Sequence, residues 1–492
     1  MLDRSPVLWI FSSFIVLFIG VGIYAGFQKQ DTTEDYLLAG RGVNPWLAAL
    51  SAVATGNSGF MFIGLIGFTY TIGLAAIWLS IGYVLGDTLA WLVVHKRLRR
   101  DSEATNSETF AAFLGHGIDG GRWITAIAAL FTLCFLGVYA AAQLQAGSKA
   151  LSVLFGWDIS IGIGLGAAIV AIYAISGGIR ASIWVGSIQS ILMIGSMVLL
   201  AGVAIANVGN ISDFWRTLNT IDPNLTSLVP TGLKFGAVPF ILAWMVSGFG
   251  VVGQPHIMIR MMAIDSVEQV DKARNLYLAL NAVLSLTATI VGLGARILLP
   301  ELATGDTELA LPVLAEAVLP MGLVGLVLVG LFSATISTAE GQLLACSAAL
   351  TQDLFPSAAK SYLWAKVGTV VMVVVILGLA LVSPSDVFVL VTFAWAALAA
   401  SLGSLLLVRV LGRSLRTTTA LAMMIIGVAT ALFWRMGLHW SDDLYEVLPG
   451  MAASLLTYAV VQPILNRKDG SQASGISSQA LEEVKHKEQS EF

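Results

Sequence analysis

Residues 54–59 read Ala-Thr-Gly-Asn-Ser-Gly and interrupt an apolar run over 44–71. That run is longer than the roughly 20 residues that a helix needs to cross a membrane. A run over 235–257 is interrupted in the same way, by Ser-Gly-Phe-Gly at 247–250 and Gly-Gln-Pro-His at 253–256. Close helix packing through small residues would explain either segment alone. Because the two runs stand five apart along the chain, we favour two helices broken at mid-membrane, whose free backbone groups can bind polar ligands.

The composition excludes most soluble classes of protein. Only 11% of the 492 residues are charged, 57% are apolar and the mean hydropathy is +0.85. Such a chain would expose large apolar patches in water. Two cysteines do not make a disulfide scaffold, and a net charge of −4 does not suit a nucleic-acid binder. The apolar runs are continuous and not alternating, so we expect an all-α integral membrane protein.

About thirteen apolar runs are candidates for membrane-spanning helices. With boundaries uncertain by a few residues, they cover 7–27, 44–71, 73–95, 122–150, 158–177, 183–208, 235–257, 272–299, 319–350, 362–383, 386–408, 417–436 and 445–465.

An odd number of crossings puts the two termini on opposite sides of the membrane. With the N-terminus outside, eighteen Lys and Arg residues fall at the inner side and six at the outer side, as the positive-inside rule requires. We therefore expect a multi-pass protein of the inner (plasma) membrane with a cytoplasmic C-terminus. The polar segment 466–492 predicts a disordered cytoplasmic tail, and His-Lys-Arg-Leu-Arg-Arg at 95–100 predicts an anchor to lipid headgroups.

Ser337 and Thr338 are adjacent hydroxyl residues within the apolar run over 319–350. Hard cations such as Na⁺ prefer oxygen ligands, so two hydroxyls and the carbonyls of a broken helix opposite could form a site of low charge. Back-bonding of Ser and Thr to their own helix is the competing interpretation.

Several motifs resemble the sodium/solute symporter family, and within it most closely the bacterial sodium/proline symporters. They are Gly253-Gln254-Pro255-His256-Ile257, Arg260-Met261-Met262-Ala263, Asp265-Ser266, Ser337-Thr338, Gln342-Leu343-Leu344-Ala345-Cys346-Ser347 and Asp353-Leu354, with Ser51-Ala52, Gly177-Gly178, Trp184 and Gln189. The resemblance extends from the first run to about residue 465.

The resemblance implies the five-plus-five inverted-repeat fold of the leucine-transporter type, working by alternating access. Its divisions would be a first helix and inner loop (1–43), a first repeat (44–208), an outer loop and second repeat (209–408), two further helices (409–465) and the tail (466–492). The implied function is Na⁺-coupled symport of a small organic solute, with an amino acid such as proline expected. A proton-coupled or Na⁺-independent transporter of the same fold is the alternative.

The resemblance also implies two sites. The sodium site would use the backbone carbonyls of Ala54, Asn57 and Ala334 and the hydroxyls of Ser337 and Thr338. The solute pocket beside it would lie near Ser58, Gly59, Tyr139, Ser247, Val251 and Pro255.

The chain departs from the family at acidic positions. Gly56 and Gly186 stand where the relatives carry aspartates associated with sodium coupling, and Ser247 and Val251 replace aromatic residues of the proline pocket. Glu340 lies one turn after Ser337, where proline symporters have no acid. We hypothesise that it supplies the missing charge, by balancing Na⁺ or by exchanging a proton; a purely structural, hydrogen-bonded Glu is the alternative.

Asp87 is a second coupling candidate, with a side chain that snorkels toward the inner surface as the alternative.

Other function classes fit less well. A sensor would need a signalling domain after the last run, where the sequence has only a short polar segment. An enzyme is not expected and no residue is a catalytic candidate, because the sequence has neither a phosphate-binding Gly-Lys-Ser/Thr loop nor a His-Glu or Cys-x-x-Cys metal motif. The expected partners are the solute and the lipid bilayer; the sequence implies neither nucleic acid nor a protein partner.

Overall fold

The computed structural model describes residues 4–28, 30, 32–355, 361–384 and 386–466. Within these ranges the backbone is helical, with a single β-bridge between Val43 and Ile264, so the expected all-α class is confirmed. The main helices are α1 (Ser5–Gly26), α2 (Thr33–Leu38), α3 (Pro45–Gly59), α4 (Leu65–Ile72), α5 (Ile77–Ala90), α6 (Lys96–Ala104), α7 (Phe110–Gly115), α8 (Gly121–Phe131), α9 (Gly137–Phe155), α10 (Ile159–Val208), α11 (Ile211–Ile221), α12 (Ala237–Phe249), α13 (Pro255–Met262), α14 (Val270–Leu298), α15 (Ala310–Val318), α16 (Met321–Ala348), α17 (Tyr362–Val382), α18 (Val387–Leu398), α19 (Ser404–Val410), α20 (Thr417–Leu432) and a last helix, Val447–Asn466. The predicted tail lies outside the described residues beyond Asn466.

By length and composition, the described residues contain ten helices able to cross a membrane, or eleven if the bent pair α12–α13 is one span. The expected count of thirteen is not confirmed. Two expected pairs of spans are continuous helical stretches here. The pair 44–71 and 73–95 lies within Pro45–Ala104, where Gly73 has φ 72°, and the pair 158–177 and 183–208 lies within α10, which is kinked at Gly178 with φ 55°. Glycine tolerates these positive angles, which other residues adopt at a cost.

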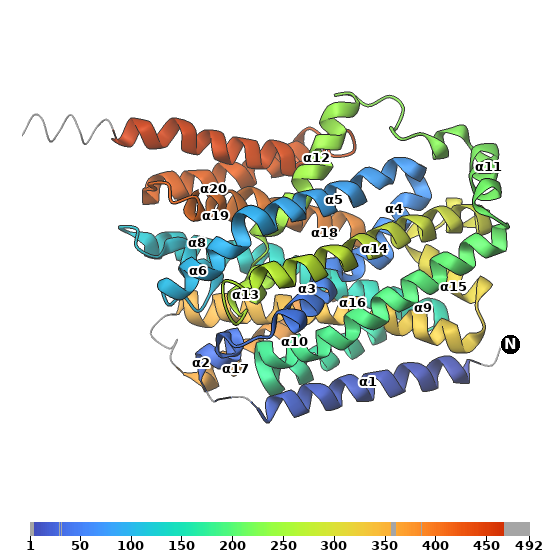
Figure 1. Ribbon diagram of the computed structural model, residues 1–492, viewed down its shortest axis with the longest axis horizontal. Helices are drawn as coiled ribbons and strands as arrows, with labels where there is room; N and C mark the ends of the chain where they lie inside the picture. Colours follow the sequence, from blue (N-terminus) through green and yellow to red (C-terminus); the bar gives the residue numbers. More distant parts are fainter. Residues whose placement is uncertain (1–3, 29, 31, 356–360, 385, 467–492) are drawn as a thin grey trace, which may run out of the picture.

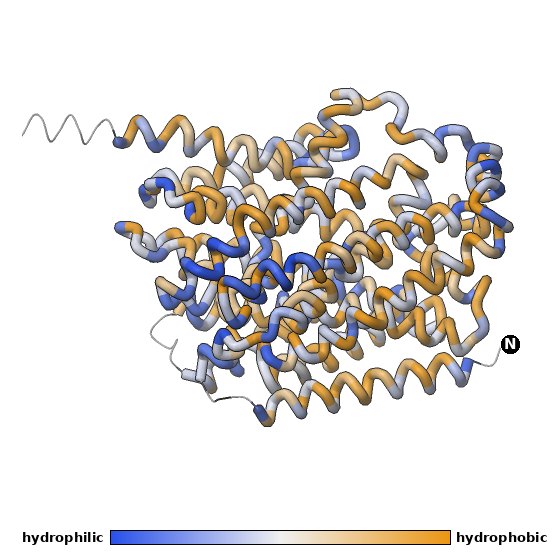
Figure 2. Tube along the Cα trace, viewed as in Figure 1, coloured by the Kyte–Doolittle hydropathy of each residue, from blue (hydrophilic) through white to orange (hydrophobic). Residues whose placement is uncertain are grey.

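Most of the long helices run along the length of the molecule, so the bundle has two ends (Figure 1). α1 begins at the end where α11 lies, and the last described helix ends at the opposite end of the bundle, where α6 also lies. Hydrophilic residues concentrate toward these ends, and apolar residues cover the helices between them (Figure 2). Along α17, Val374 is 64% exposed, as expected for a helix that faces lipid.

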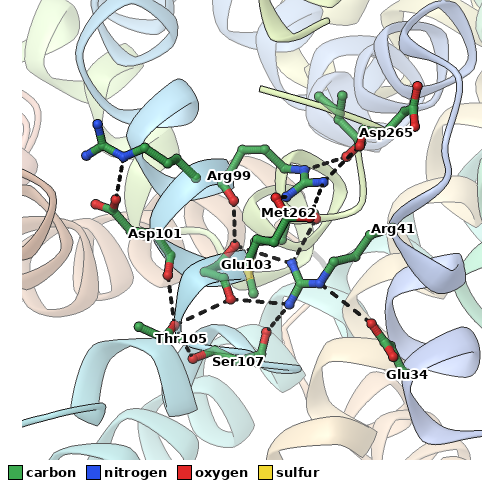
Figure 3. Close-up of polar contacts among 12 residues, drawn as sticks. Glu34, Arg41, Arg99, Asp101, Glu103, Thr105, Ser107, Met262 and Asp265 are labelled. Atoms are coloured by element: carbon green, nitrogen blue, oxygen red, sulfur yellow. Dashed lines mark hydrogen bonds and ion pairs between the residues drawn. The ribbon is translucent and has the colours of Figure 1, made fainter. Parts of the chain in front are cut away.

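Arg99 closes the end of the bundle where α6 meets α13 (Figure 3). Its side chain is 1% exposed, donates to the carbonyls of Ile264 at 2.5 Å and Asp265 at 2.9 Å, and pairs with Glu103 at 2.7 Å. The predicted lipid anchor is therefore wrong for Arg99. A helix end leaves carbonyl groups without partners, and the carbonyls just beyond the end of α13 bind the buried guanidinium instead of lipid.

Arg41 continues the same network between α13 and the segment that joins α2 to α3. Its guanidinium donates to the carbonyls of Met262 at 3.2 Å and Ser107 at 2.8 Å, and lies 3.7 Å from the Glu34 carboxylate (Figure 3). We call Arg41, Arg99 and the carbonyls of 262–265 the latch, and the end that they close the latch end.

Candidate functional site

The first break lies at the end of α3. Ser58 has φ 35° and ψ 176°, outside the helical region, and a π-helical turn, Phe60–Gly64, follows before α4. Helix α9 bonds the freed groups: Gln143 Oε1 accepts from the Gly59 amide at 2.7 Å, and the Tyr139 hydroxyl donates to Ser58 Oγ at 3.2 Å. The break predicted at 54–59 is therefore confirmed, and a neighbouring helix satisfies its polar groups.

The second break separates α12 from α13, whose axes are bent by 59°. Gln254 is extended between them, with φ −97° and ψ 100°, and Pro255 begins α13 at the position where a proline costs the helix no hydrogen bond. Trp395 of α18 bridges the break, because its indole N–H donates to the Ser247 carbonyl at 2.9 Å and its own carbonyl accepts from Gln254 at 3.3 Å. The second predicted break is confirmed as well.

Oxygen atoms of α16 meet the first break in a buried cluster. The Ser337 hydroxyl lies 3.0 Å from the Ala54 carbonyl and 3.2 Å from the Ala334 carbonyl. The Thr338 hydroxyl lies 3.5 Å from the Ala54 carbonyl and 3.0 Å from that of Thr55. We call these two hydroxyls and three carbonyls the oxygen cluster; it consists of the oxygen ligands that hard cations prefer.

Four of the five predicted sodium-site residues, Ala54, Ala334, Ser337 and Thr338, therefore meet in the oxygen cluster. The fifth, Asn57, lies one turn away, where its carbonyl accepts the Phe60 amide and its side-chain amide donates to the Val53 carbonyl at 2.9 Å. The Thr55 carbonyl is an additional member, and side-chain types in the sequence could not indicate it.

Two cavities follow one another from the surface toward the breaks. A vestibule of about 960 Å³ opens between α4, α12, α18 and the loops near Asp306 and Asp443. A buried cavity of about 30 Å³ lies against the first break. Trp244, Thr392 and Tyr445 line both, and the rings of Trp244 and Tyr445 stack at 4.8 Å. We call the open end the vestibule end; the aromatic stack forms the wall between the two spaces.

The six predicted solute residues divide among four places. Tyr139 and Ser247 line the buried cavity, and Ser58 accepts the hydrogen bond of Tyr139. Val251 is buried in the turn of the second break, while Gly59 packs between α9 and α16, where a Cβ would lie 2.7 Å from Thr335 Cγ2. Pro255 lines a separate small cavity that Asp353 also borders.

Four further residues of the site were not predicted from the sequence: Gln143, Trp395, Trp244 and Tyr445. Gln143 carried a usable signal, since a polar side chain within an apolar run is costly unless it has a partner. The aromatic residues carried none, because their position at the cavity depends on contacts between helices far apart in the sequence.

Glu340 and Arg260 are fully buried and face each other beside the oxygen cluster. Arg260 donates to Ser51 Oγ at 3.1 Å, to Ser182 Oγ at 2.8 Å and to the His256 carbonyl at 2.5 Å. The Glu340 carboxylate faces Arg260 and Ser182 but forms no hydrogen bond of ordinary geometry among the described residues. The pair brings opposite charges of α16 and of α13, the helix after the second break, near each other.

The two glycines at acidic positions of the family face polar groups. A Cβ at Gly186 would lie 3.2 Å from Ser51 Oγ, which Arg260 also contacts. A Cβ at Gly56 would lie 3.3 Å from the Tyr277 hydroxyl and 3.7 Å from that of Tyr83.

Asp87 lies in the interior between α5 and α14, with no exposed surface. Its side chain does not snorkel toward Lys96, which pairs with Asp271 at 3.1 Å. The neighbours of Asp87 are the hydroxyls of Tyr83 and Tyr277.

The sequence of this chain is similar to those of known transport proteins. Residues 36–427 match the model of the sodium:solute symporter family. The sodium/proline symporter of Salmonella typhimurium is 32% identical over 91% of this chain and 90% of its own length. The high-affinity proline transporter PutP of Bacillus subtilis is 30% identical over 88% of this chain and 93% of its own length.

Solved structures show the same fold. A Na⁺-coupled sialic acid symporter in a substrate-bound outward-open state matches 94% of this chain and 98% of its own with a TM-score of 0.79, at 21% identity. MhsT in complex with L-phenylalanine matches 85% of this chain and 98% of its own with a TM-score of 0.57, at 15% identity. The fold is of the leucine-transporter type, as expected. These relatives are transporters, so the chain is a multi-pass membrane transporter and not an enzyme. It belongs to the sodium:solute symporter family.

Proposed function

We propose that the protein carries a small organic solute, an amino acid of the proline type, across the plasma membrane together with Na⁺, by alternating access. The oxygen cluster carries this proposal. Ser337 and Thr338 bring two neutral hydroxyls within 3.5 Å of the Ala54 carbonyl, next to a helix break, where a cation of low charge density finds several oxygen ligands at once.

The position of the cluster explains why an ion would drive transport. Its ligands belong to α3 and α16, so a bound Na⁺ holds these two helices together. A ligand shifts a conformational equilibrium only by its difference in affinity between the two states. A cation bound here therefore favours the state in which the two helices are in contact, and this is the state with an open vestibule.

The chemistry of the lining of the buried cavity suits a small zwitterionic solute, although its volume of about 30 Å³ must increase to admit an amino acid. Its lining is aromatic and apolar with a few neutral polar groups, including Asn57, Ser247 and Thr392, and contains no charged side chain among the described residues. The ammonium and carboxylate groups of an amino acid would then be met by the backbone groups of the two breaks, as half-helix ends do in transporters. The proline transporters among the relatives favour proline as the first solute to test.

The proposal is tested by uptake of radiolabelled proline into proteoliposomes with an imposed Na⁺ gradient. Thr338→Ala removes one oxygen of the cluster, so we expect the half-saturating Na⁺ concentration to rise about tenfold, the equivalent of about 1.4 kcal/mol. Thr287→Val on α14 is the control, because the Thr287 hydroxyl only bonds back to its own helix. An unchanged Na⁺ dependence in Thr338→Ala would exclude the oxygen cluster as the sodium site.

Coupling to protons is the second candidate, and the buried Glu340 beside Arg260 is the observation that favours it. A carboxylate at this depth can alternate between a proton and its cationic partner. Uptake driven by a pH gradient in choline buffer without Na⁺ would establish this alternative; uptake that needs Na⁺ at every pH would exclude it. An N-terminus outside and a cytoplasmic C-terminus belong to the proposal in both cases.

A further inference from the structure

Asp87 is a buried carboxylate that lacks a neutralising partner. It has no exposed surface, and neither of its oxygens forms a hydrogen bond of ordinary geometry with the described residues. Among the described side chains, the Tyr277 hydroxyl is the group that interacts appreciably with the Asp87 carboxylate, and no cationic side chain interacts with it. An ionised carboxylate in such surroundings is costly, so this position must be compensated in the working protein.

Further unpartnered oxygen and nitrogen atoms surround the same point. The Tyr277 hydroxyl is buried without a hydrogen bond among the described residues, and so are both amide atoms of Asn281, one turn further along α14. Helices α5 and α14 run alongside each other in a fixed register, because Ser80 bonds Thr289 at 3.0 Å and the ring of Trp91, the residue after α5, lies 5.3 Å from that of Tyr277. This register places Asp87 and Asn281 at the same height along the two helices.

A proton alone would leave most of these atoms unsatisfied. It neutralises Asp87 and can bridge the carboxyl group to the Tyr277 hydroxyl, but it leaves the other oxygen of Asp87 and the Asn281 carbonyl oxygen without partners. A cation takes several oxygen ligands together, and one carboxylate with neutral oxygens suits a monovalent hard cation better than a divalent one. We propose that Asp87, Tyr277 and Asn281, with the Tyr83 hydroxyl, form a second Na⁺ site, separate from the oxygen cluster.

The second site is linked to the solute cavity through Tyr83. The Tyr83 hydroxyl donates to the Gly56 carbonyl of the first break at 2.9 Å, and both residues line the buried cavity. A cation that takes the Tyr83 oxygen as a ligand would hold that hydroxyl, and with it the backbone of the break, in one position. Occupancy of the second site would therefore affect solute binding in the cavity through Tyr83 and the Gly56 backbone.

The test is equilibrium binding of radiolabelled Na⁺ to the purified full chain, with choline as the replacing ion. We expect two sites in the wild type and the loss of one in Asp87→Asn, with the affinity of the other retained. Thr88→Val is the matched control on the same helix, because the Thr88 hydroxyl bonds back to Val84. A binding isotherm of Asp87→Asn that superimposes on the wild-type isotherm overturns the proposal.

Folding of the variant is checked separately. In choline, Asp87→Asn should unfold at the wild-type temperature or above, because it removes an unpaired carboxylate, and Na⁺ should stabilise it less than the wild type. The double variant Gly56→Asp/Asp87→Asn brings a carboxylate to the other side of the same two hydroxyls and should restore the lost site. A double variant that folds but still binds one ion fewer would contradict the assigned ligands.

The two sites can fail independently. Loss of one Na⁺ in Asp87→Asn with no effect of Thr338→Ala would support this inference and refute the oxygen cluster. A single wild-type site that Thr338→Ala weakens and Asp87→Asn leaves intact would refute this inference alone and assign a proton to Asp87.

Discussion

Glu340 and Arg260 place opposite charges side by side in an otherwise apolar interior. Arg260 has its hydrogen bonds to Ser51, Ser182 and the His256 carbonyl, but only Glu340 balances its charge strongly. Removing one partner of a buried pair leaves the other charge uncompensated, at a cost of about 3–5 kcal/mol. We therefore expect the loss of either charge to destabilise the packing of α13 and α16 beside the oxygen cluster.

We expect Glu340→Gln to lose more than tenfold in uptake rate and to change its ion dependence. The test is the proteoliposome assay with imposed Na⁺ or H⁺ gradients. Gly186→Asp should rescue Glu340→Gln in part, because a side chain at 186 approaches Ser51 Oγ, the group that Arg260 contacts from the other side. A rate and ion dependence equal to those of the wild type would refute any coupling role of Glu340.

At the scale of helices, the sequence predicted the positions of both breaks because glycine, proline and small polar residues are unfavourable within an apolar helix. It did not predict the partners of the freed groups. Gln143 and Trp395 bond those groups from α9 and α18, which are far away in the sequence. The number of spans was not predicted either, because the two runs that the sequence separates at 178–182 form one helix, α10, kinked at Gly178.

Helices α5 and α12 touch through glycine, at backbone distance. A Cβ at Gly82 would lie 2.5 Å from the Trp244 carbonyl carbon and 2.6 Å from its oxygen. Backbone atoms cannot rotate away as a side chain can, so Gly82→Ala must push the helices apart. We expect a loss of about 1–3 kcal/mol and a lower unfolding temperature in detergent. Gly202→Ala, whose Cβ would meet nothing within 4 Å, should keep the wild-type temperature; equal values for the two variants would contradict the close approach.

The whole molecule is open at one end and closed at the other. The vestibule of about 960 Å³ leads toward the buried cavity from its own end. At the latch end, Arg41 and Arg99 tie α6 and the segment between α2 and α3 to the carbonyls of 262–265. The proposed alternating access requires a reverse state, and we expect the end of α13 to separate from α6 in that state. The latch therefore stabilises the state with an open vestibule relative to the reverse state.

Hydrogen bonds that involve a charged group contribute about 1.5–3 kcal/mol each, so removing those of Arg99 should shift the population between the two states about tenfold or more. The measurement is maleimide labelling of Leu233→Cys, which lines the vestibule, in a chain with Cys134 and Cys346 replaced. We expect Arg99→Leu to slow labelling about tenfold, because the vestibule is closed for more of the time. Arg97→Leu is the matched control, since its exposed side chain bonds only to Val93 of its own helix. Equal labelling rates for Arg99→Leu and Arg97→Leu would mean that the buried arginine stabilises both states equally and does not shift the population between them.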